Sequence, residues 1–238
     1  MKIALIGYGK MGKAIENIAI NRGHVITAKI TSKNTQQINS AEFKQADVAI
    51  EFSNPESALE NILHCLRNKI PVVVGTTGWL DKIDDIRLAS SNNNTPVFYA
   101  SNFSIGMNIT FALNEKLAKW MNELGEYDVN IEETHHIHKL DAPSGTAISL
   151  AEDIIKNLDR KDEWTLNDTN KSKNLKLVSL REGEVPGTHI VEYKSDIDRI
   201  ELKHEAFNRT GFALGAVKVA EWIPEKNGIL NMKDYLNY

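Results

Sequence analysis

The sequence predicts an α/β protein with two parts, an N-terminal domain built on a parallel β-sheet and an α+β domain built on a mixed sheet. Over residues 1–102, short apolar runs alternate with amphipathic segments, which is the pattern of right-handed β-α-β units. Beyond residue 102 this alternation stops, and a long helical segment is followed by strand-like runs that lie close together in the chain. A chain of 238 residues is long enough for two such domains.

The elements of the first domain can be placed from apolar runs and helix caps. Strands are expected at residues 3–6, 25–30, 47–52, 72–74 and 97–100, each a short apolar run of the kind found in buried parallel sheets. Helices are expected at 13–22, directly after Asn54, and at 81–91. Gly23 suits the end of the first helix, and Ser53 or Asn54 can cap the second.

The second domain is assigned to residues 103–211, and the C-terminal segment 212–238 is assigned back to the first domain. A long helix is expected at 105–124, a strand at 127–133 and an amphipathic helix at 147–158. The polar, lysine-rich stretch 159–174 is expected to be an exposed loop. Strand-like runs at 175–181, 188–194 and 199–204 favour an antiparallel or mixed sheet, and a final helix is expected at 212–222.

Composition excludes several classes of function. The net charge of −4 gives no general attraction to nucleic acid or to an anionic membrane. Cys65 is the only cysteine, which excludes an intrachain disulfide and fits a reducing cytosol. The sequence contains no run of about 18 apolar residues, and its first apolar run is too short for a signal-peptide core. We therefore expect a cytoplasmic protein with neither nucleic acid nor membrane as a partner.

A glycine-rich loop follows the first expected strand and opens the first expected helix. It fits the pattern G-x-G-x-x-G, with the residues Gly7, Tyr8, Gly9, Lys10, Met11 and Gly12. In this context the glycines permit a tight turn, close approach to a pyrophosphate and close helix–strand packing. The helix N-terminus offers N–H groups to the phosphates. The loop predicts a Rossmann dinucleotide-binding domain; the alternative is a glycine turn that binds no ligand.

The end of the second strand bears on which dinucleotide is used. A site selective for NAD usually has Asp or Glu there, on the ribose hydroxyls. This chain instead has Thr31, Ser32 and Lys33, which together with Lys10 could hold a 2′-phosphate. We hypothesise that NADPH is used at least as well as NADH. The alternative is that these residues belong to an ordinary solvated surface.

Two further loops follow strand ends at the carboxyl edge of the expected sheet, where ligands bind in such folds. We expect both to line the nicotinamide pocket, although either one alone would be an ordinary loop. Their residues are Gly75, Thr76 and Thr77 in the first loop and Ser101, Asn102 and Phe103 in the second.

The segment ETHHIHKLDAPSGTA at residues 133–147 concentrates proton donors, cations and a helix start. His135, His136 and Lys139 precede a turn in which hydroxyls and backbone N–H groups can bind an anion, at Ser144, Gly145 and Thr146. This combination suits an anionic substrate that also needs a proton. The histidines could instead bind metal, but Glu133 and Asp141 do not complete a recognisable ligand spacing, so no metal is expected. Asp141 is interpreted as a turn residue or as the group that orients the lysine, and His138 as peripheral.

The same segment closely resembles the signature of the 4-hydroxy-tetrahydrodipicolinate reductase family, also called dihydrodipicolinate reductase. Other segments resemble that family in the same order along the chain, namely GYGKMG at 7–12, GTTG at 75–78, SNFSIGMN at 101–108, REGEVPGTH at 181–189 and KHEAFNRTGFALGA at 203–216. The resemblance therefore covers nearly the whole chain. The acidic ribose-binding residue of the family is missing here, which puts a preference for NADH in doubt.

The resemblance implies an enzyme of the diaminopimelate and lysine pathway. NAD(P)H would reduce an α,β-unsaturated cyclic imine that forms when the 4-hydroxyl group of the substrate leaves as water. By position, His135 and Lys139 resemble the residues proposed for proton transfer, and either could supply the proton. His136, Gly145 and Thr146, with Ser144 beside them, match positions that bind the carboxylates of a small dicarboxylate substrate. The family also implies a homotetramer joined through the sheets of the substrate domains.

Two other classes of protein would share part of this sequence pattern. Another Rossmann reductase, such as an aspartate dehydrogenase, would share the glycine loop but should lack HHIHK-x-D-A-P-S-G-T. A redox-sensing protein that binds NAD(P)H without turnover would have no use for the proton donors among His135, His136 and Lys139.

Overall fold

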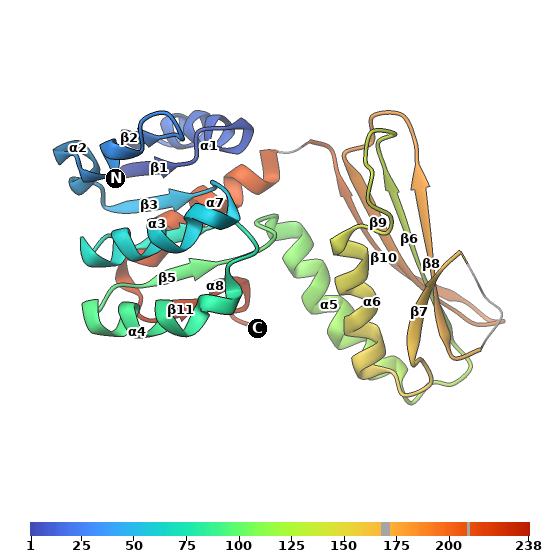
Figure 1. Ribbon diagram of the computed structural model, residues 1–238. Coiled ribbons are helices and arrows are strands. Elements are labelled where there is room, and N and C mark those ends of the chain that lie inside the picture. Colours follow the sequence, from blue (N-terminus) through green and yellow to red (C-terminus); the bar gives the residue numbers. More distant parts are fainter. Residues whose placement is uncertain (168–171, 209) are drawn as a thin grey trace. The chain divides into compact units, whose positions relative to one another are not determined.

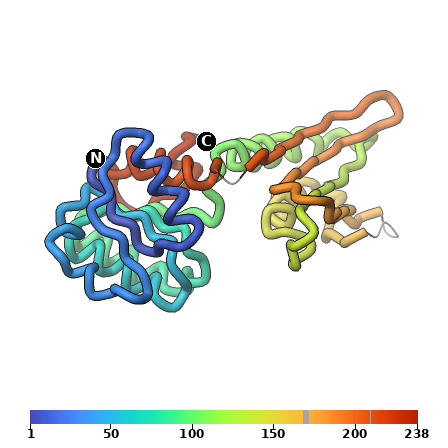
Figure 2. The backbone as a smooth tube through the Cα atoms, turned by 90° about the horizontal axis from the view of Figure 1, so that it is seen from above, coloured from blue at the N-terminus to red at the C-terminus, as the bar shows by residue number. Residues whose placement is uncertain are grey.

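The computed structural model describes residues 1–167, 172–208 and 210–238, and the chain forms two compact units. Unit 1 comprises Met1–Ile105 and Thr210–Tyr238, and unit 2 comprises Gly106–Arg209. Both chain termini belong to unit 1 (Figure 2). Within the described ranges, no helix has both the length and the apolar character needed to cross a membrane.

Unit 1 contains a six-stranded parallel sheet in the order β11-β5-β4-β3-β1-β2 (Figure 1). Its strands are β1 (Lys2–Ile6), β2 (Val25–Ile30), β3 (Val48–Glu51), β4 (Val72–Val74), β5 (Val97–Tyr99) and β11 (Ile229–Leu230). Its α-helices are α1 (Lys10–Asn21), α2 (Ala41–Lys44), α3 (Pro55–Arg67), α4 (Ile83–Asn93), α7 (Thr210–Trp222) and α8 (Met232–Leu236). Short 3₁₀ helices occur at Thr35–Asn39, Leu80–Lys82 and Ile223–Glu225.

Both faces of this sheet are buried, as expected for parallel strands with continuous apolar sequence. Ile3 and Leu5 of β1 join the core under α1 and α7, whereas the alternate residues Ala4 and Ile6 join the core under α3 and α4. The carboxyl ends of β1, β2 and β3 therefore meet at one edge, where the glycine loop follows β1.

Unit 2 contains a five-stranded mixed sheet in the order β10-β9-β6-β8-β7. Its strands are β6 (Asp128–His135), β7 (Glu163–Leu166), β8 (Asn174–Arg181), β9 (Gly187–Lys194) and β10 (Arg199–Ala206). The β6–β8 and β7–β8 pairs are parallel, and the β6–β9 and β9–β10 pairs are antiparallel. The helices α5 (Ile105–Met121) and α6 (Gly145–Asn157) supply apolar residues to a core with β6, β8 and β9. The predicted fold class, a Rossmann-type domain with a mixed-sheet domain, is confirmed.

The prediction of a loop over residues 159–174 was wrong in part. Residues Glu163–Leu166 form β7, which pairs in parallel with β8. The four-residue strand has no clear alternation of its own, and it is stabilised by the ladder that β8 offers and by Trp164, which packs against the core. Residues 168–171 of the predicted loop lie outside the described residues.

Other short elements were not predicted either, because they too carry little local sequence signal. The helices α2 and α8 and the two-residue strand β11 were not predicted, and α6 begins two residues earlier than expected, at Gly145. The strand β11 exists through its pairing with β5, which is distant in the chain. Such pairing leaves little local signal in so short a segment.

Candidate active site

The glycine loop between β1 and α1 is shaped so that side chains would not fit. Gly7 has φ +91°, and a Cβ atom on it would lie 1.9 Å from the carbonyl oxygen of Phe52. A Cβ atom on Gly12 would lie 2.3 Å from the carbonyl oxygen of Gly7. The helix cap, Gly9, contributes no side chain to the first turn of α1. The loop therefore leaves the helix N-terminus open to a phosphate, which fits the predicted dinucleotide.

A pocket of about 240 Å³ lies beside this loop at the carboxyl edge of the sheet. Its lining comes from the ends of β1, β2 and β3 and from α3, namely Ile6, Gly7, Ile30, Thr31, Ser32, Thr35, Ser53, Asn54, Ser57 and Asn61. Of the predicted 2′-phosphate group, Thr31 and Ser32 line the pocket, whereas Lys33 and Lys10 are exposed residues outside its lining. The hydroxyl of Thr31 already donates to Asn34 Oδ1 at 2.7 Å.

The neighbouring lysine of β2, Lys29, is ion-paired with Glu16 of α1. Lys29 Nζ lies 2.5 Å from Glu16 Oε1, and it also lies 4.9 Å from the centroid of the Tyr8 ring. The Tyr8 hydroxyl donates to Glu16. These contacts tie the glycine loop to α1 and β2, and they leave Ser32 and Lys33 as the groups of this strand end that can meet a 2′-phosphate.

The two other predicted cofactor loops differ in what they can offer. Thr76 is buried, and its hydroxyl oxygen accepts the backbone N–H of Ser53 at 2.8 Å, whereas Thr77 is exposed. A Cβ atom on Gly75 would lie 2.2 Å from the ring of Phe52, so only glycine fits there.

The loop after β5 presents backbone more than side chain. The ring of Phe103 is buried in the core, 5.4 Å from the ring of Phe52 and 5.9 Å from that of Phe98. Its side chain is therefore unavailable to a ligand. Ser101 is exposed, and Asn102 Oδ1 accepts the N–H of Ser104 at 2.9 Å.

In unit 2 the histidine segment joins the end of β6 to the start of α6. His135 is the last residue of β6, and Ser144 caps α6 by accepting the N–H of Ala147 at 3.2 Å. Gly145 and Thr146 form the first turn of α6, whose N–H groups have no partner within the helix. The predicted anion-binding helix end therefore starts next to the strand that carries His135.

Glu133 is the centre of this site. Its carboxylate is fully buried and accepts hydrogen bonds from the backbone N–H of Ser144 at 3.0 Å and from the hydroxyl of Ser179 at 2.6 Å. The guanidinium of Arg181 lies 3.5 Å away. Burial alone would raise the pKa of Glu133, but the contacts with His189, Ser144 and Ser179 outweigh it and hold the pKa well below its ordinary value.

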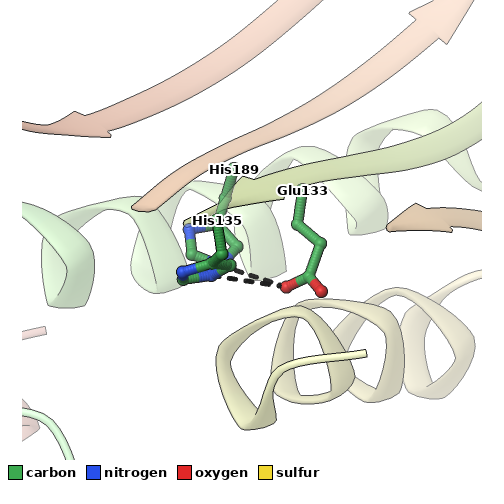
Figure 3. A group of neighbouring side chains, drawn as sticks. All are labelled: Glu133, His135 and His189. Carbon is green, nitrogen blue, oxygen red and sulfur yellow. Dashed lines mark hydrogen bonds and ion pairs between the residues drawn. The ribbon is translucent and has the colours of Figure 1, made fainter. Parts of the chain in front are cut away.

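Two imidazoles converge on the same carboxylate (Figure 3). The Nε2 atoms of His135 and His189 each lie 3.6 Å from Glu133 Oε2, and they lie 3.4 Å from one another. Burial, followed by repulsion from His189, lowers the pKa of His135 to about 4. His135 is therefore an uncharged imidazole at neutral pH.

Glu133, His135 and His189 each place one potential metal ligand within 4.8 Å of the others. Within the segment 133–147 only Glu133 and Asp141 offered carboxylates for such a set, and His189 lies outside that segment. The Oε1 atom of Glu133 is already used by Ser144 and Ser179, and the Arg181 guanidinium stands beside it. This arrangement favours a hydrogen-bonding role for the three groups.

Lys139 and Asp141 form an ion pair on the loop that follows β6. Lys139 Nζ lies 2.6 Å from Asp141 Oδ2, and the side chain of Lys139 is only 20% exposed. The pairing with Lys139 lowers the pKa of Asp141. Arg181 fastens this loop to the sheet by donating to the backbone carbonyls of Lys139 and Asp141.

The other two histidines of the segment lie on the loop itself. His138 is exposed and pairs with Glu184 at 2.9 Å, in keeping with a peripheral place. His136 is half-buried, and its ring lies 5.9 Å from that of His138. Of the predicted residues, His135 and Ser144 therefore contact Glu133, and the backbone of Lys139 is bonded to Arg181. His136 lies on the loop that follows β6.

Sequence reasoning missed His189, Arg181, Ser179 and the central place of Glu133. Arg181 and His189 do stand at the ends of the segment REGEVPGTH, to which no role was assigned. Strand register places these residues in the site, because Glu133 lies opposite His189 on β9 and opposite Ser179 on β8. That register could not be read from the separate segments.

Comparison with known proteins covers the whole chain. The family model described as dihydrodipicolinate reductase, N-terminus, matches residues 1–103, and the one described as dihydrodipicolinate reductase, C-terminus, matches residues 106–236. The 4-hydroxy-tetrahydrodipicolinate reductase of Christiangramia forsetii is 47% identical over 238 residues, which is 100% of this chain and 98% of that protein.

Solved structures support the same fold. A dipicolinate-bound dihydrodipicolinate reductase from Paenisporosarcina sp. TG-14 matches with a TM-score of 0.83 at 22% identity, covering 99% of each chain. An amine dehydrogenase from Mycobacterium smegmatis matches with a TM-score of 0.58 at 10% identity, covering 98% of this chain and 95% of that one. With the two family models and the close curated relative, these findings show that the chain belongs to the dihydrodipicolinate reductase family.

Proposed function

We infer that the protein catalyses the reaction for which its curated relative is named, the NAD(P)H-dependent reduction of 4-hydroxy-tetrahydrodipicolinate, in diaminopimelate and lysine biosynthesis. The observation that carries this inference is the family match over both units, joined to a proton-transfer cluster at the start of α6. When bound, NAD(P)H supplies the hydride that reduces C4 after the 4-hydroxyl group has left as water.

The first turn of α6 is the proposed carboxylate site. The N–H groups of Gly145 and Thr146 and the positive end of the helix dipole favour an anion there. His136 is proposed to contact the second carboxylate. The structural neighbour that binds dipicolinate, itself a dicarboxylate, supports a ligand of this class.

We propose that Lys139 is the proton donor and that His135 is not. A histidine whose pKa is about 4 carries no proton to give at neutral pH, whereas the ammonium group of Lys139 is ion-paired with Asp141. In the proposed step, an N–H bond of the Lys139 ammonium breaks as a C–H bond forms at C3 of the substrate enamine. The neutral amine left beside Asp141 then takes a proton from solvent.

Cofactor contacts are proposed for the glycine loop, the pocket beside it and the backbone of the loops at 75–77 and 101–103. Ser32 and Lys33 are proposed to meet the 2′-phosphate of NADPH, because Lys29 is held by Glu16. A cytoplasmic location is proposed in keeping with the biosynthetic role.

A coupled assay tests these proposals. A synthase makes the substrate from pyruvate and aspartate semialdehyde, and the oxidation of NADPH or NADH is followed. We expect turnover with both, with kcat/KM for NADPH at least equal to that for NADH.

Lys139→Ala should lower kcat by roughly 100- to 10,000-fold, the usual contribution of general acid catalysis. Near-wild-type turnover in this variant would remove Lys139 from the mechanism, and a strong preference for NADH would contradict the assigned phosphate site.

A further inference from the structure

A row of polar side chains crosses four neighbouring strands of unit 2. Strand register places His204 opposite His189, His189 opposite Glu133, and Glu133 opposite Ser179. Glu133 and His189 fall on the buried positions of their alternating strands, the positions that otherwise carry the apolar core. Ionisable groups in such a place destabilise a fold unless they satisfy one another or serve a site.

His135 lies at the edge of this row, two residues beyond Glu133 on β6. Its ring meets that of His189 edge-on, with centroids 5.2 Å apart and planes at 72°. Gly187 makes room for it, because a Cβ atom there would lie 2.9 Å from His135 Cε1. The ring of His135 therefore lies close to the backbone of β9 at Gly187. It also lies beside the Glu133–His189 pair, as Figure 3 shows.

We propose that Glu133 and His189 are positioning residues for His135, which together fix its ring in the substrate site. This inference rests on the proposed function, in which Lys139 donates the proton and His135 lines the site without donating. Neither Glu133 nor His189 is assigned contact with the substrate.

Glu133 is suited to the role because it cannot easily move. Its carboxylate is held by the N–H of Ser144, the hydroxyl of Ser179 and the guanidinium of Arg181, all independent of His135. Both imidazoles therefore lie beside a carboxylate whose position is fixed by other groups.

His189 is held by hydrogen bonding on one side only. Its Nε2 atom lies 3.2 Å from the hydroxyl of Ser144, whereas its Nδ1 atom is buried without a hydrogen-bond partner among the described residues. A buried N–H without an acceptor is strongly unfavourable, so the hydrogen belongs on Nε2, facing Ser144 and Glu133. The next histidine of the row, His204, also buries its Nδ1 atom without such a partner.

The groups around His135 have opposite effects on whether its ring takes up a proton. Glu133 on its own strand favours a proton on the ring, whereas His189 on β9, Arg181 on β8 and Lys139 on the following loop oppose one. Burial adds to the second group. Removing Glu133 or His189 singly should therefore move the titration of His135 in opposite directions, which a purely structural role would not do.

The first arm of the test needs no substrate. The full-length protein is labelled at the histidine Cε1 position, and the His135 signal is followed by NMR as the pH is lowered. We expect the midpoint of His135 to rise in His189→Leu, which removes the opposing group, and to fall in Glu133→Gln. His138→Asn, a change to the exposed histidine of the same segment, should leave it unchanged. Equal midpoints in wild type and both variants, or shifts in the same direction, would overturn the proposal.

The second arm measures kinetics with the coupled assay. His189→Leu should lower kcat between about 10- and 100-fold, the scale expected when a site group is displaced, with KM values within about twofold. His189→Gln keeps a donor at the Nε2 position and should recover most of the kcat. Equal losses in both variants would overturn the proposal. If the wild-type protein does not turn over the substrate at all, the proposed function fails, while the NMR arm still decides whether Glu133 and His189 control His135.

Discussion

At the residue scale, the unusual feature is a fully buried carboxylate that is kept ionised. Glu133 stays charged because it accepts hydrogen bonds from Ser144 at the cap of α6 and from Ser179 on β8, and because His189 on β9 lies 3.6 Å away. His135 stays uncharged beside this carboxylate, because burial, His189 and the nearby cations Lys139 and Arg181 lower its pKa and outweigh Glu133, which raises it. The division of roles between His135 and Lys139 follows from this environment more than from residue type.

The low pKa of His135 makes a prediction about stability against pH. An unfolded histidine takes up a proton as pH falls through about 6.5, but folded His135 does so only near 4. Protonation therefore favours the unfolded chain between these values, and each unit of pKa difference is worth about 1.4 kcal/mol. Stability should fall with acidity from pH 6.5 to 5, and it should fall less steeply in His135→Gln.

Chemical denaturation at several pH values in this window measures the two slopes. His138→Asn serves as the control, because His138 is exposed. Equal slopes for wild type and His135→Gln would show that His135 titrates normally in the folded protein.

At the element scale, the site depends on how closely β9 approaches β6. Gly187→Ala should push the His135 ring away from Glu133, because the new Cβ atom would lie 2.9 Å from the ring. We expect kcat to fall between about 10- and 100-fold, as for other small displacements of site groups. Gly125→Ala is the matched control, since a Cβ atom there meets nothing within 4 Å. A Gly187→Ala enzyme with wild-type kcat would contradict the proposed place of His135.

The sequence was sufficient to predict elements with a strong local period or cap. Asn54 does cap α3, and the glycine loop does join β1 to α1. It was not sufficient for β7 and β11, which are short and depend on partner strands. The candidate site divides in the same way. His135, Lys139 and Ser144 stand in one segment and could be predicted together, whereas His189 and Arg181 reach them only through strand register.

At the scale of the whole molecule, we propose a homotetramer, as the family resemblance implies. The sheet of unit 2 has one face in its core, and its other face carries half-buried side chains such as Ile190 on β9. Sedimentation equilibrium at micromolar concentration should give a mass four times that of the 26.7 kDa chain. A concentration-independent monomer would contradict this proposal without affecting the proposed chemistry.

The central claim is that this chain moves a hydride from NADPH to C4 of 4-hydroxy-tetrahydrodipicolinate as water is lost. The most direct measurement uses NADPH stereospecifically deuterated at C4 of the nicotinamide, in two separate preparations, with freshly generated substrate and analysis of the product by mass spectrometry and NMR. We predict that one of the two preparations gives a product with one deuterium at C4, in amounts equal to the NADPH consumed. Absence of deuterium from the product in both preparations, or oxidation of NADPH without equal formation of product, would contradict the account.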